Sequence, residues 1–460
     1  MTSATTTLST WLADLSWDAV PGRVRERAKH LVLDGVACGL VGAQLPWSRI
    51  AADGVTALEG NGSAMVMGCG RTISPAAAVL LNGTFIQGFE LDDFHPLAPL
   101  HSASLVLPSL LATAELLGEV SGKDFLLGVV AGYEVGPRVG LALHGTQMLN
   151  RGWHSGSVFG TMASAAASGV LRRLGAEQFE DAIALGATQS SGLMAAQYEA
   201  MSKRMHHGFA ARNGFYAAGL AAVGYTGIKQ VFEREYGGFL STFGEGHDPD
   251  ITQVAKGLGE TWHTEAHVIK SYAAMGGLSG AIDAALTLRD KVSVDDIAQI
   301  DIEVSSTVYH HGWWTPERPL TAIGAQMNIG YAVSVALLDG AVLPDQFTDR
   351  RIDGDDVWEL LPKVRVHHSE EFDRLRFATR VSITLRDGTK VVEMVDQPRG
   401  GPANPLRNED IVAKYRALTA RVIEPERAEA IERHVLTLDT ATDVTELIGL
   451  LAAPVRGALD

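Results

Sequence analysis

The residue pattern of this 460-residue chain changes its period along the sequence, and this change limits the folds that the chain can adopt. Over the first 260 residues, apolar and small side chains recur at helical spacing, as in 23–42, 160–175 and 207–227. From about Ile297 the pattern alternates between apolar and polar residues, which is typical of strands. The sequence therefore predicts a large helical body with a later region that contains a sheet.

The predicted sheet region has several alternating runs. Residues 296–308 and 363–367 are predicted to be extended, and 380–395 forms two runs joined at Asp387-Gly388, a strong hairpin signal. From about Asn408 the pattern is helical again. We therefore predict a mainly α fold with an α+β insertion, divided into a helical body at 1–265, an α+β lid domain at 266–395 and a helical return to the body at 396–460.

The formal charge of −16 limits the partners of the chain. Such an excess of carboxylates disfavours nucleic acid and anionic membrane surfaces as partners. No apolar run reaches the length of about 18 residues that would predict a membrane span. The N-terminus lacks a basic segment and carries Asp14 and Asp18, which argues against a signal or transit peptide and favours the cytoplasm. An anionic substrate would need a local cationic pocket.

Cys38 and Cys69 are the only cysteines, and this count limits the cofactors. It excludes a disulfide framework and an iron–sulfur cluster of the usual kind, which needs three or four thiolates. The polar clusters described below do not have the spacing of a zinc site, and the sequence contains no phosphate-binding glycine loop. The residues alone therefore give no sign of an iron–sulfur, zinc or nucleotide site.

The segment ELDDFHPLAPLHSAS, at 90–104, is the first candidate for chemistry. Asp92 and Asp93 are followed by His95 and His101, in a stretch whose prolines oppose a continuous helix. Carboxylates and imidazoles in a shaped loop can hold and transfer protons near neutral pH. The alternative is an Asx-type turn with two surface histidines.

Two further clusters contribute polar groups. RGWHSGSVFG places His154 in a glycine-flanked turn before a helix, where backbone N–H groups can receive a carboxylate. MSKRMHHGFAARNG holds Lys203, Arg204 and His207 in the densest cationic patch of the chain. A solvated basic face is the alternative for this patch, but its interleaved apolar residues indicate that part of it faces inward.

The predicted insertion adds Lys270, Tyr272 and Tyr331. Lys270 and Tyr272 follow its beginning, where a lid could supply a cation to a substrate. Tyr331 lies in an apolar helix predicted at 325–340 and ended by Gly340. Most tyrosines in such a helix are core residues whose hydroxyl bonds to the backbone, and this is the alternative to a catalytic role.

Several long segments, in the right order along nearly the whole chain, resemble the MmgE/PrpD family. They are ELDDFHPLAPLHSASLVLP, RGWHSGSVFG, GLMAAQYEAMSKRMHHGFAARNG, ERPLTAIGAQMNIGYAV and HHSEEFD. The family includes 2-methylcitrate dehydratase, iminodisuccinate epimerase and cis-aconitate decarboxylase. The segments are most similar to those of its fungal members that convert cis-aconitate to itaconate.

The resemblance implies a homodimer of two-domain subunits and a lyase that acts on a tricarboxylate with neither a metal nor an organic cofactor. It implies that the site includes Asp92, Asp93, His101, His154, Lys203, His207, Lys270 and Tyr331, and we add Arg204 and Tyr272 as substrate-binding residues. Decarboxylation of cis-aconitate needs cations on the retained carboxylates and an acid aimed at the far carbon. We expect Lys203, Lys270 and His154 in the first role and His101 or Tyr331 in the second, with Asp93 holding the imidazolium.

The sequence also departs from the family pattern. Family members commonly carry cysteines and a histidine soon after the lid lysine–tyrosine pair, whereas this chain has Ala274, Met275 and Ser279. Phe94 stands where a serine or threonine often follows the aspartate pair. A hydro-lyase or an epimerase acting on a related di- or tricarboxylate therefore stays an alternative. A dimeric binding protein without turnover is another.

Overall fold

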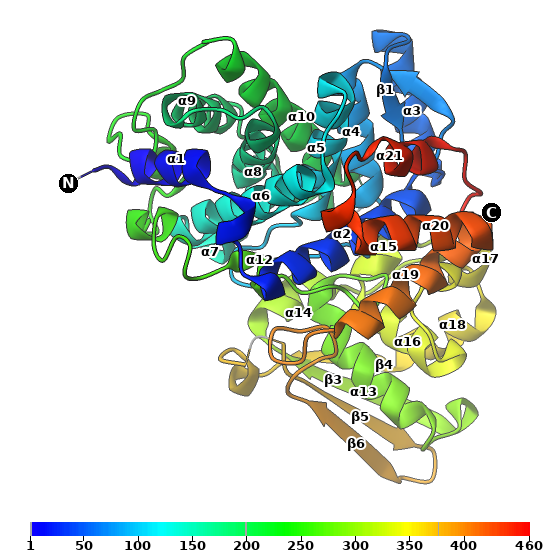
Figure 1. The fold of residues 1–460 in the computed structure, drawn as a ribbon. Coiled ribbons are helices and arrows are strands. Elements are labelled where there is room, and N and C mark those ends of the chain that lie inside the picture. Colours follow the sequence, from blue (N-terminus) through cyan, green and yellow to red (C-terminus); the bar gives the residue numbers. More distant parts are fainter. Residues whose placement is uncertain (1, 198–199, 376) are drawn as a thin grey trace.

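A computed structural model describes residues 2–197, 200–375 and 377–460. It consists of a large helical body and a smaller α+β region, as predicted (Figure 1). The helices of the body up to the α+β region are α1 Ala4–Asp14, α2 Gly22–Gly42, α3 Pro46–Glu59, α4 Pro75–Ile86, α5 Ala103–Leu117, α6 Gly122–Ala142, α7 Gly145–Asn150, α8 Ser155–Leu171, α9 Ala176–Ala187, α10 Ser202–Ala222, α11 Phe239–Phe243 and α12 His263–Ala266.

The α+β region contains a four-stranded sheet in the order β4-β3-β5-β6, with β3 parallel to β4 and antiparallel to β5. Figure 1 shows α13 lying along this sheet. The elements are α13 Ser279–Arg289, β3 Ile297–Val304, α14 Ser306–Gly312, α15 Ala322–Met327, α16 Ile329–Asp339, α17 Asp349–Ile352, α18 Asp355–Leu360, β4 Val364–His368, β5 Thr379–Leu385 and β6 Lys390–Val395.

The C-terminal helices are α19 Asn408–Val422, α20 Pro425–Leu436 and α21 Thr445–Ala452. Figure 1 shows α19 and α20 beside α2, the helix near the other end of the chain, and these helices are in contact. The predicted hairpin is confirmed: β5 and β6 pair, and Gly388 adopts a φ of +87° that a residue with a side chain rarely takes.

Three local predictions need correction. The helix predicted at 325–340 is divided, because the Asn328 side chain accepts the N–H of Tyr331 and begins α16 anew. The helical pattern of 160–175 continues too far, because the helix stops at Leu171 and Gly175 precedes α9. A short hairpin of β1 Ala64–Val66 and β2 Arg71–Ile73 lies in the predicted helical part, since three-residue strands leave too little pattern to detect.

Small residues let α10 pack closely against its neighbours. A Cβ atom at Gly208 would lie 2.2 Å from the Leu80 carbonyl oxygen of α4, and one at Gly214 would lie 2.2 Å from the Thr161 carbonyl oxygen of α8. These close backbone approaches explain the high glycine and alanine content of the body. They also fix the position of α10, which carries Lys203, Arg204 and His207.

One helix, α6, is long and apolar enough to cross a membrane by length and composition. The share of its apolar window that is buried inside the protein is 94%. Its apolar surface is therefore covered by the rest of the protein, as in a core helix.

Candidate active site

The predicted loop between α4 and α5 is confirmed. After Gln87 the chain leaves the helix, and the His95 N–H donates to the Leu100 carbonyl at 2.9 Å, closing the turn that contains both prolines. The Asp93 carboxylate accepts the N–H of Ala103 at 3.0 Å, at the first residue of α5. Phe94 exchanges backbone hydrogen bonds with Val268, so the loop is joined to the segment that leads to Lys270.

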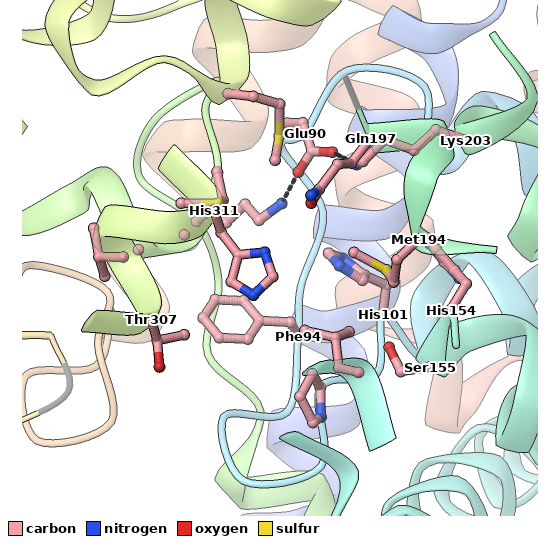
Figure 2. Close-up of a pocket in the computed structure, with 18 of the residues that line it drawn as sticks. Glu90, Phe94, His101, His154, Ser155, Met194, Gln197, Lys203, Thr307 and His311 are labelled. Carbon is pink, nitrogen blue, oxygen red and sulfur yellow. Dashed lines mark hydrogen bonds and ion pairs between the residues drawn. The ribbon is translucent and has the colours of Figure 1, made fainter. Parts of the chain in front are cut away.

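This loop forms one wall of a cavity of about 170 Å³ (Figure 2). The opposite wall comes from α14 and from the segment around Met275. Its lining residues are divided about equally between apolar and polar ones, and the polar and charged side chains converge on the space. The polar and charged lining residues are Gln87, Glu90, His101, His154, Ser155, Gln197, Lys203, Lys270, Thr307 and His311.

Glu90 is the centre of a buried cationic cluster. Its carboxylate pairs with Lys203, with Arg204 at 2.7 Å and with Lys270 at 2.7 Å. Burial alone would raise the pKa of Glu90, but the three cations lower it well below its ordinary value. Burial lowers the pKa of Lys203 to about 8, although Glu90 opposes this change. The cluster therefore holds more positive than negative charge, in a chain that is acidic overall.

Glu90 also has an unusual backbone. Its φ is +55°, a left-handed value that is uncommon for residues other than glycine. Lys414 of α19 donates to the carbonyl of the next residue, Leu91, at 2.6 Å, and pairs with Asp34 of α2 at 2.6 Å. Strained backbone of this kind persists where surrounding contacts determine it, and it is common at functional sites.

Asp92 and His101 form a second charged pair beside the cluster. The His101 Nδ1 lies 3.1 Å from the Asp92 carboxylate, which is completely buried, while the imidazole itself lines the cavity. Burial would raise the pKa of Asp92, but His101 and Lys270 lower it below its ordinary value. Asp92 therefore fixes the orientation of the His101 imidazole beside the cavity.

Asp93 behaves differently from its neighbour. It lies outside the cavity lining, and burial together with the adjacent Asp92 raises its pKa to about 8. The hydrogen bond from the Ala103 N–H and the nearby Tyr133 hydroxyl partly oppose the change. Its carboxyl group is therefore mostly protonated at neutral pH. This corrects the prediction that Asp93 holds the imidazolium, because Asp92 occupies that position.

His154 and His207 extend the site from α8 and α10. His154 precedes α8, lines the cavity and packs against His207 with ring centroids 5.1 Å apart. His207 packs at the same centroid distance against His101. Burial lowers the pKa of both residues well below the ordinary value, and neighbouring imidazoles lower it further. His207 is not among the lining residues, and it supports His101 and His154 from behind.

Two predicted tyrosines lie away from the cavity. Tyr331 is fully buried in α16, packs against Phe347 and donates its hydroxyl to the Gln346 carbonyl. Tyr272 donates its hydroxyl to Asp283 of α13. Neither residue lines the cavity. The geometry therefore contradicts the predicted role of Tyr331 as proton donor and does not support substrate contact by Tyr272.

Arg204, the remaining cation that was predicted to bind the substrate, is buried behind Lys203. Its two terminal nitrogens bond to Glu90 at 2.7 Å and to Gln326 at 2.8 Å, and Gln326 in turn donates to the carbonyls of Phe89 and Ala273. Arg204 does not line the cavity. This corrects its predicted role in substrate binding: it holds Glu90 in place and joins the loop to α15.

Sequence reasoning missed several lining residues. Glu90 was quoted within its motif but received no role, because an isolated glutamate in a loop carries no signal of its partners. His311 was overlooked beside its exposed neighbour His310, although a seven-residue helix exposes one face and hides the other. Gln87 also lines the cavity, and its amide atoms have no hydrogen-bond partner among the described residues. Tyr198 of the AAQY segment lies outside those residues.

A second histidine cluster lies behind the loop. His263 and His267 are four residues apart on and after α12, a spacing that sequence reasoning overlooked. His263 lies 3.2 Å from the His95 imidazole, and His267 lies 2.7 Å from the Ser102 hydroxyl. Burial lowers the pKa of all three histidines, so they are uncharged at neutral pH. Over residues 2–197, 200–375 and 377–460, no group of three histidine, cysteine or acidic side chains is placed to hold a metal ion.

Comparisons with known proteins agree with this architecture. The MmgE/PrpD N-terminal domain model matches residues 6–252, and the MmgE/PrpD C-terminal domain model matches residues 272–440. The chain therefore belongs to the MmgE/PrpD family.

The curated relatives of this chain have names that specify one activity within the family. The chain is 45% identical to a cis-aconitate decarboxylase-like protein of Aspergillus oryzae, covering 98% of this chain and 97% of that one. It is 42% identical to a cis-aconitate decarboxylase of Aspergillus terreus, over 98% and 96% of the two chains. A human cis-aconitate decarboxylase is 28% identical over 98% and 95%.

The residues that depart from the family pattern have different locations. Met275 lines the cavity, Ala274 is buried, and Ser279 lines a small adjoining pocket beside Phe94 and Lys270. Phe94 itself lines the cavity and packs near His101, with ring centroids 6.3 Å apart. Phe94 and Met275 therefore make part of the cavity wall apolar.

Proposed function

We propose that this protein is a carboxy-lyase that converts cis-aconitate to itaconate without a cofactor. The observation that carries the proposal is the cavity beside Glu90, where three cations and one carboxylate adjoin the Asp92–His101 pair. The full-length similarity to cis-aconitate decarboxylases supports the same substrate.

Substrate binding follows from the excess of positive charge. In the substrate-free protein, Glu90 neutralises only part of the charge of Lys203, Arg204 and Lys270. The ammonium groups of Lys203 and Lys270, which line the cavity, bind the two retained carboxylates of the substrate. His154 and Gln87 add hydrogen bonds. Arg204 stays behind the cavity and keeps Glu90 in place.

The reaction begins when the bond between the methylene carbon and its carboxylate breaks. Carbon dioxide departs, and the electron pair of that bond forms the new double bond to the methylene carbon. The electrons of the original double bond move to the far carbon and its carboxylate, giving a dienolate. Lys203 and Lys270 stabilise the charge that develops there, which is the largest contribution expected from the site.

We assign the proton donor to His101. As an imidazolium paired with Asp92, it gives its proton to the far carbon of the dienolate, and the product is itaconate. Solvent then protonates the imidazole again before the next turnover. Apolar residues of the cavity wall adjoin the departing carboxylate, where poor solvation favours the loss of neutral carbon dioxide.

We also propose a homodimer in the cytoplasm, with the α+β region acting as a lid. The outer face of α10 exposes Phe209, Tyr216 and Leu220, and Val223 just after the helix is 81% exposed. An apolar face of this kind on one long helix is typical of a subunit interface. Analytical ultracentrifugation of the wild-type protein and of Leu220→Glu tests it: a dimer is expected for the former and a monomer for the latter.

The experiment that tests the reaction is proton NMR of the purified protein with cis-aconitate in deuterated buffer, without added metal. We expect two vinyl signals of itaconate and one deuterium in its methylene group. Unchanged cis-aconitate would reject the proposal. Dehydration of 2-methylcitrate or epimerisation of iminodisuccinate by the same sample would support the alternative hydro-lyase or epimerase, whereas tight tricarboxylate binding without product would support the binding protein.

A further inference from the structure

The helix α14 supplies one face to the cavity. Thr307, Val308 and His311 line the space, and their spacing places them on one side of the helix. His310 points elsewhere: it is exposed and packs against Tyr309, with ring centroids 5.4 Å apart. Two adjacent histidines therefore differ in location, one inside the cavity and one outside it.

The position of α14 is fixed at its beginning. The Ser305 side chain accepts the N–H of Val308 at 3.4 Å, and the N–H of Ser306 donates to Asp373 at 2.8 Å. The helix follows β3 directly, so the central strand of the sheet holds it. The His311 imidazole is thus carried on a short and well-anchored element rather than on a free loop.

His311 reaches from the α+β region towards the body. Its Nε2 lies 3.4 Å from the Asn150 side-chain oxygen at the end of α7. Figure 2 shows its imidazole entering the cavity beside Phe94, opposite the side from which His101 enters. The imidazole therefore stands between the two parts of the protein, at the space where the substrate is proposed to bind.

The surroundings of His311 on this wall are apolar. Met275, Val308, Met327 and Phe377 line the cavity there, so a carboxylate facing α14 would meet His311 and Thr307 as polar side chains of that helix. A buried carboxylate needs a hydrogen-bond donor, because an unpaired charge in such surroundings is costly.

We infer that His311 is a substrate-contacting residue that donates a hydrogen bond to a retained carboxylate of the bound tricarboxylate, from the side opposite His101. This inference rests on the proposed function for the identity of the ligand. It assigns the α+β region a direct part in recognising the substrate, in addition to Lys270.

Isothermal titration calorimetry with tricarballylate tests the contact, because this saturated tricarboxylate cannot form the dienolate. His311→Ala is expected to weaken its binding about 10- to 100-fold, the usual effect of losing a hydrogen bond to a charged group. His311→Gln, which keeps a donor, is expected to recover part of the loss. His310→Ala is the matched control and is expected to bind like the wild type.

His311 could also matter only because it contacts Asn150 and so joins the α+β region to the body. The variant Asn150→Ala tests this explanation, because it removes that contact and keeps His311. We expect this variant to bind tricarballylate like the wild type. Equal losses in Asn150→Ala and His311→Ala, or wild-type binding in His311→Ala, would overturn the inference. Steady-state kinetics give a second readout: His311→Ala is expected to raise KM more than it lowers kcat.

The inference and the proposed function can fail separately. If the wild type binds tricarballylate in a His311-dependent manner but leaves cis-aconitate unchanged, the contact stands and the decarboxylase proposal fails. If the wild type forms itaconate and His311→Ala matches His310→Ala in binding and KM, the decarboxylase proposal stands and the contact fails. Circular dichroism of each variant identifies any loss of folding.

Discussion

Two buried glutamates of the helical body, Glu90 and Glu134, show how similar groups can serve different purposes. Glu134 pairs with Arg138 at 3.3 Å and accepts two hydrogen bonds from Thr264, joining α6 to α12 away from the cavity. Burial raises the pKa of Glu134 despite Arg138, whereas three cations lower that of Glu90. The Glu134–Arg138 pair has one charge of each sign and serves as a structural contact. The cluster around Glu90 has an excess of positive charge beside a cavity, which suits the binding of an anion.

The largest expected effect concerns the structural cluster. Glu134→Ala leaves Arg138 buried without its carboxylate, and we expect the free energy of unfolding to fall by about 3–5 kcal/mol. Urea unfolding at pH 7 measures this change. Glu424→Ala removes an exposed partner of Arg456 and serves as the control, with an expected change below about 1 kcal/mol. Equal midpoints for the two variants would contradict the structural role.

Substitutions in the cavity beside Glu90 are expected to change activity rather than stability. We expect Lys203→Ala and His101→Ala each to lower kcat/KM by about 10²–10³, because each removes a group that stabilises or protonates the dienolate. Lys229→Ala and His368→Ala remove groups with carboxylate partners outside the cavity, and we expect them to keep wild-type rates. Near-wild-type turnover in Lys203→Ala or His101→Ala would remove that residue from the mechanism.

Asp93 offers a test through pH. Its pKa of about 8 lies above the ordinary value of 3.8, so the folded state keeps a proton that the unfolded chain releases. The resulting stabilisation is complete below about pH 4 and is lost as the pH rises through 8. It should appear as a slope of about −1.4 kcal/mol per pH unit in the free energy of unfolding between these values.

Asp93→Asn is expected to remove this slope in urea unfolding between pH 5 and 8. Asp14→Asn, a change at an exposed carboxylate, should leave it in place. The same slope in Asp93→Asn and the wild type would mean that Asp93 is ionised in the folded protein.

The smallest effect is expected for Tyr331→Phe. The variant loses one hydrogen bond to the Gln346 carbonyl, and we expect a decrease of about 1 kcal/mol in the free energy of unfolding with kcat within about threefold of wild type. Tyr415→Phe is a matched control, since its hydroxyl also bonds to a backbone carbonyl. A hundredfold lower kcat in Tyr331→Phe alone would return this residue to the list of proton donors.

The parts of the fold that were predictable depend on local rules. Asp387-Gly388 specifies a hairpin from two residues, and Pro96 and Pro99 oppose a helix wherever they occur. The division of the helix at Asn328 was not predicted, because an asparagine in an apolar run indicates a cap only when its partner N–H is known. The β1–β2 hairpin was missed because each strand has three residues.

The site was predictable in its residue types but not in its geometry. Lys203 was identified from the densest cationic patch, His101 from the loop that combines carboxylates and imidazoles, and both from the family resemblance. The sequence could not distinguish the roles of Asp92 and Asp93, because the two residues are adjacent. In the structure, the carboxylate of Asp92 contacts His101, whereas that of Asp93 accepts a hydrogen bond at the beginning of α5. The sequence also could not show that Tyr331 points into the core, because α16 is apolar on all sides.

The close contact between α8 and α10 has a consequence for engineering. A Cβ atom at Gly156 would lie 2.0 Å from Nε2 of His207, so even an alanine there would displace the imidazole. Redesign of the substrate range at this contact would therefore displace the imidazole that packs against His101 and His154. The face of α14 with Thr307 and Val308 consists of side chains on a separate element, and libraries directed at these two positions are the better starting point for accepting other polycarboxylates.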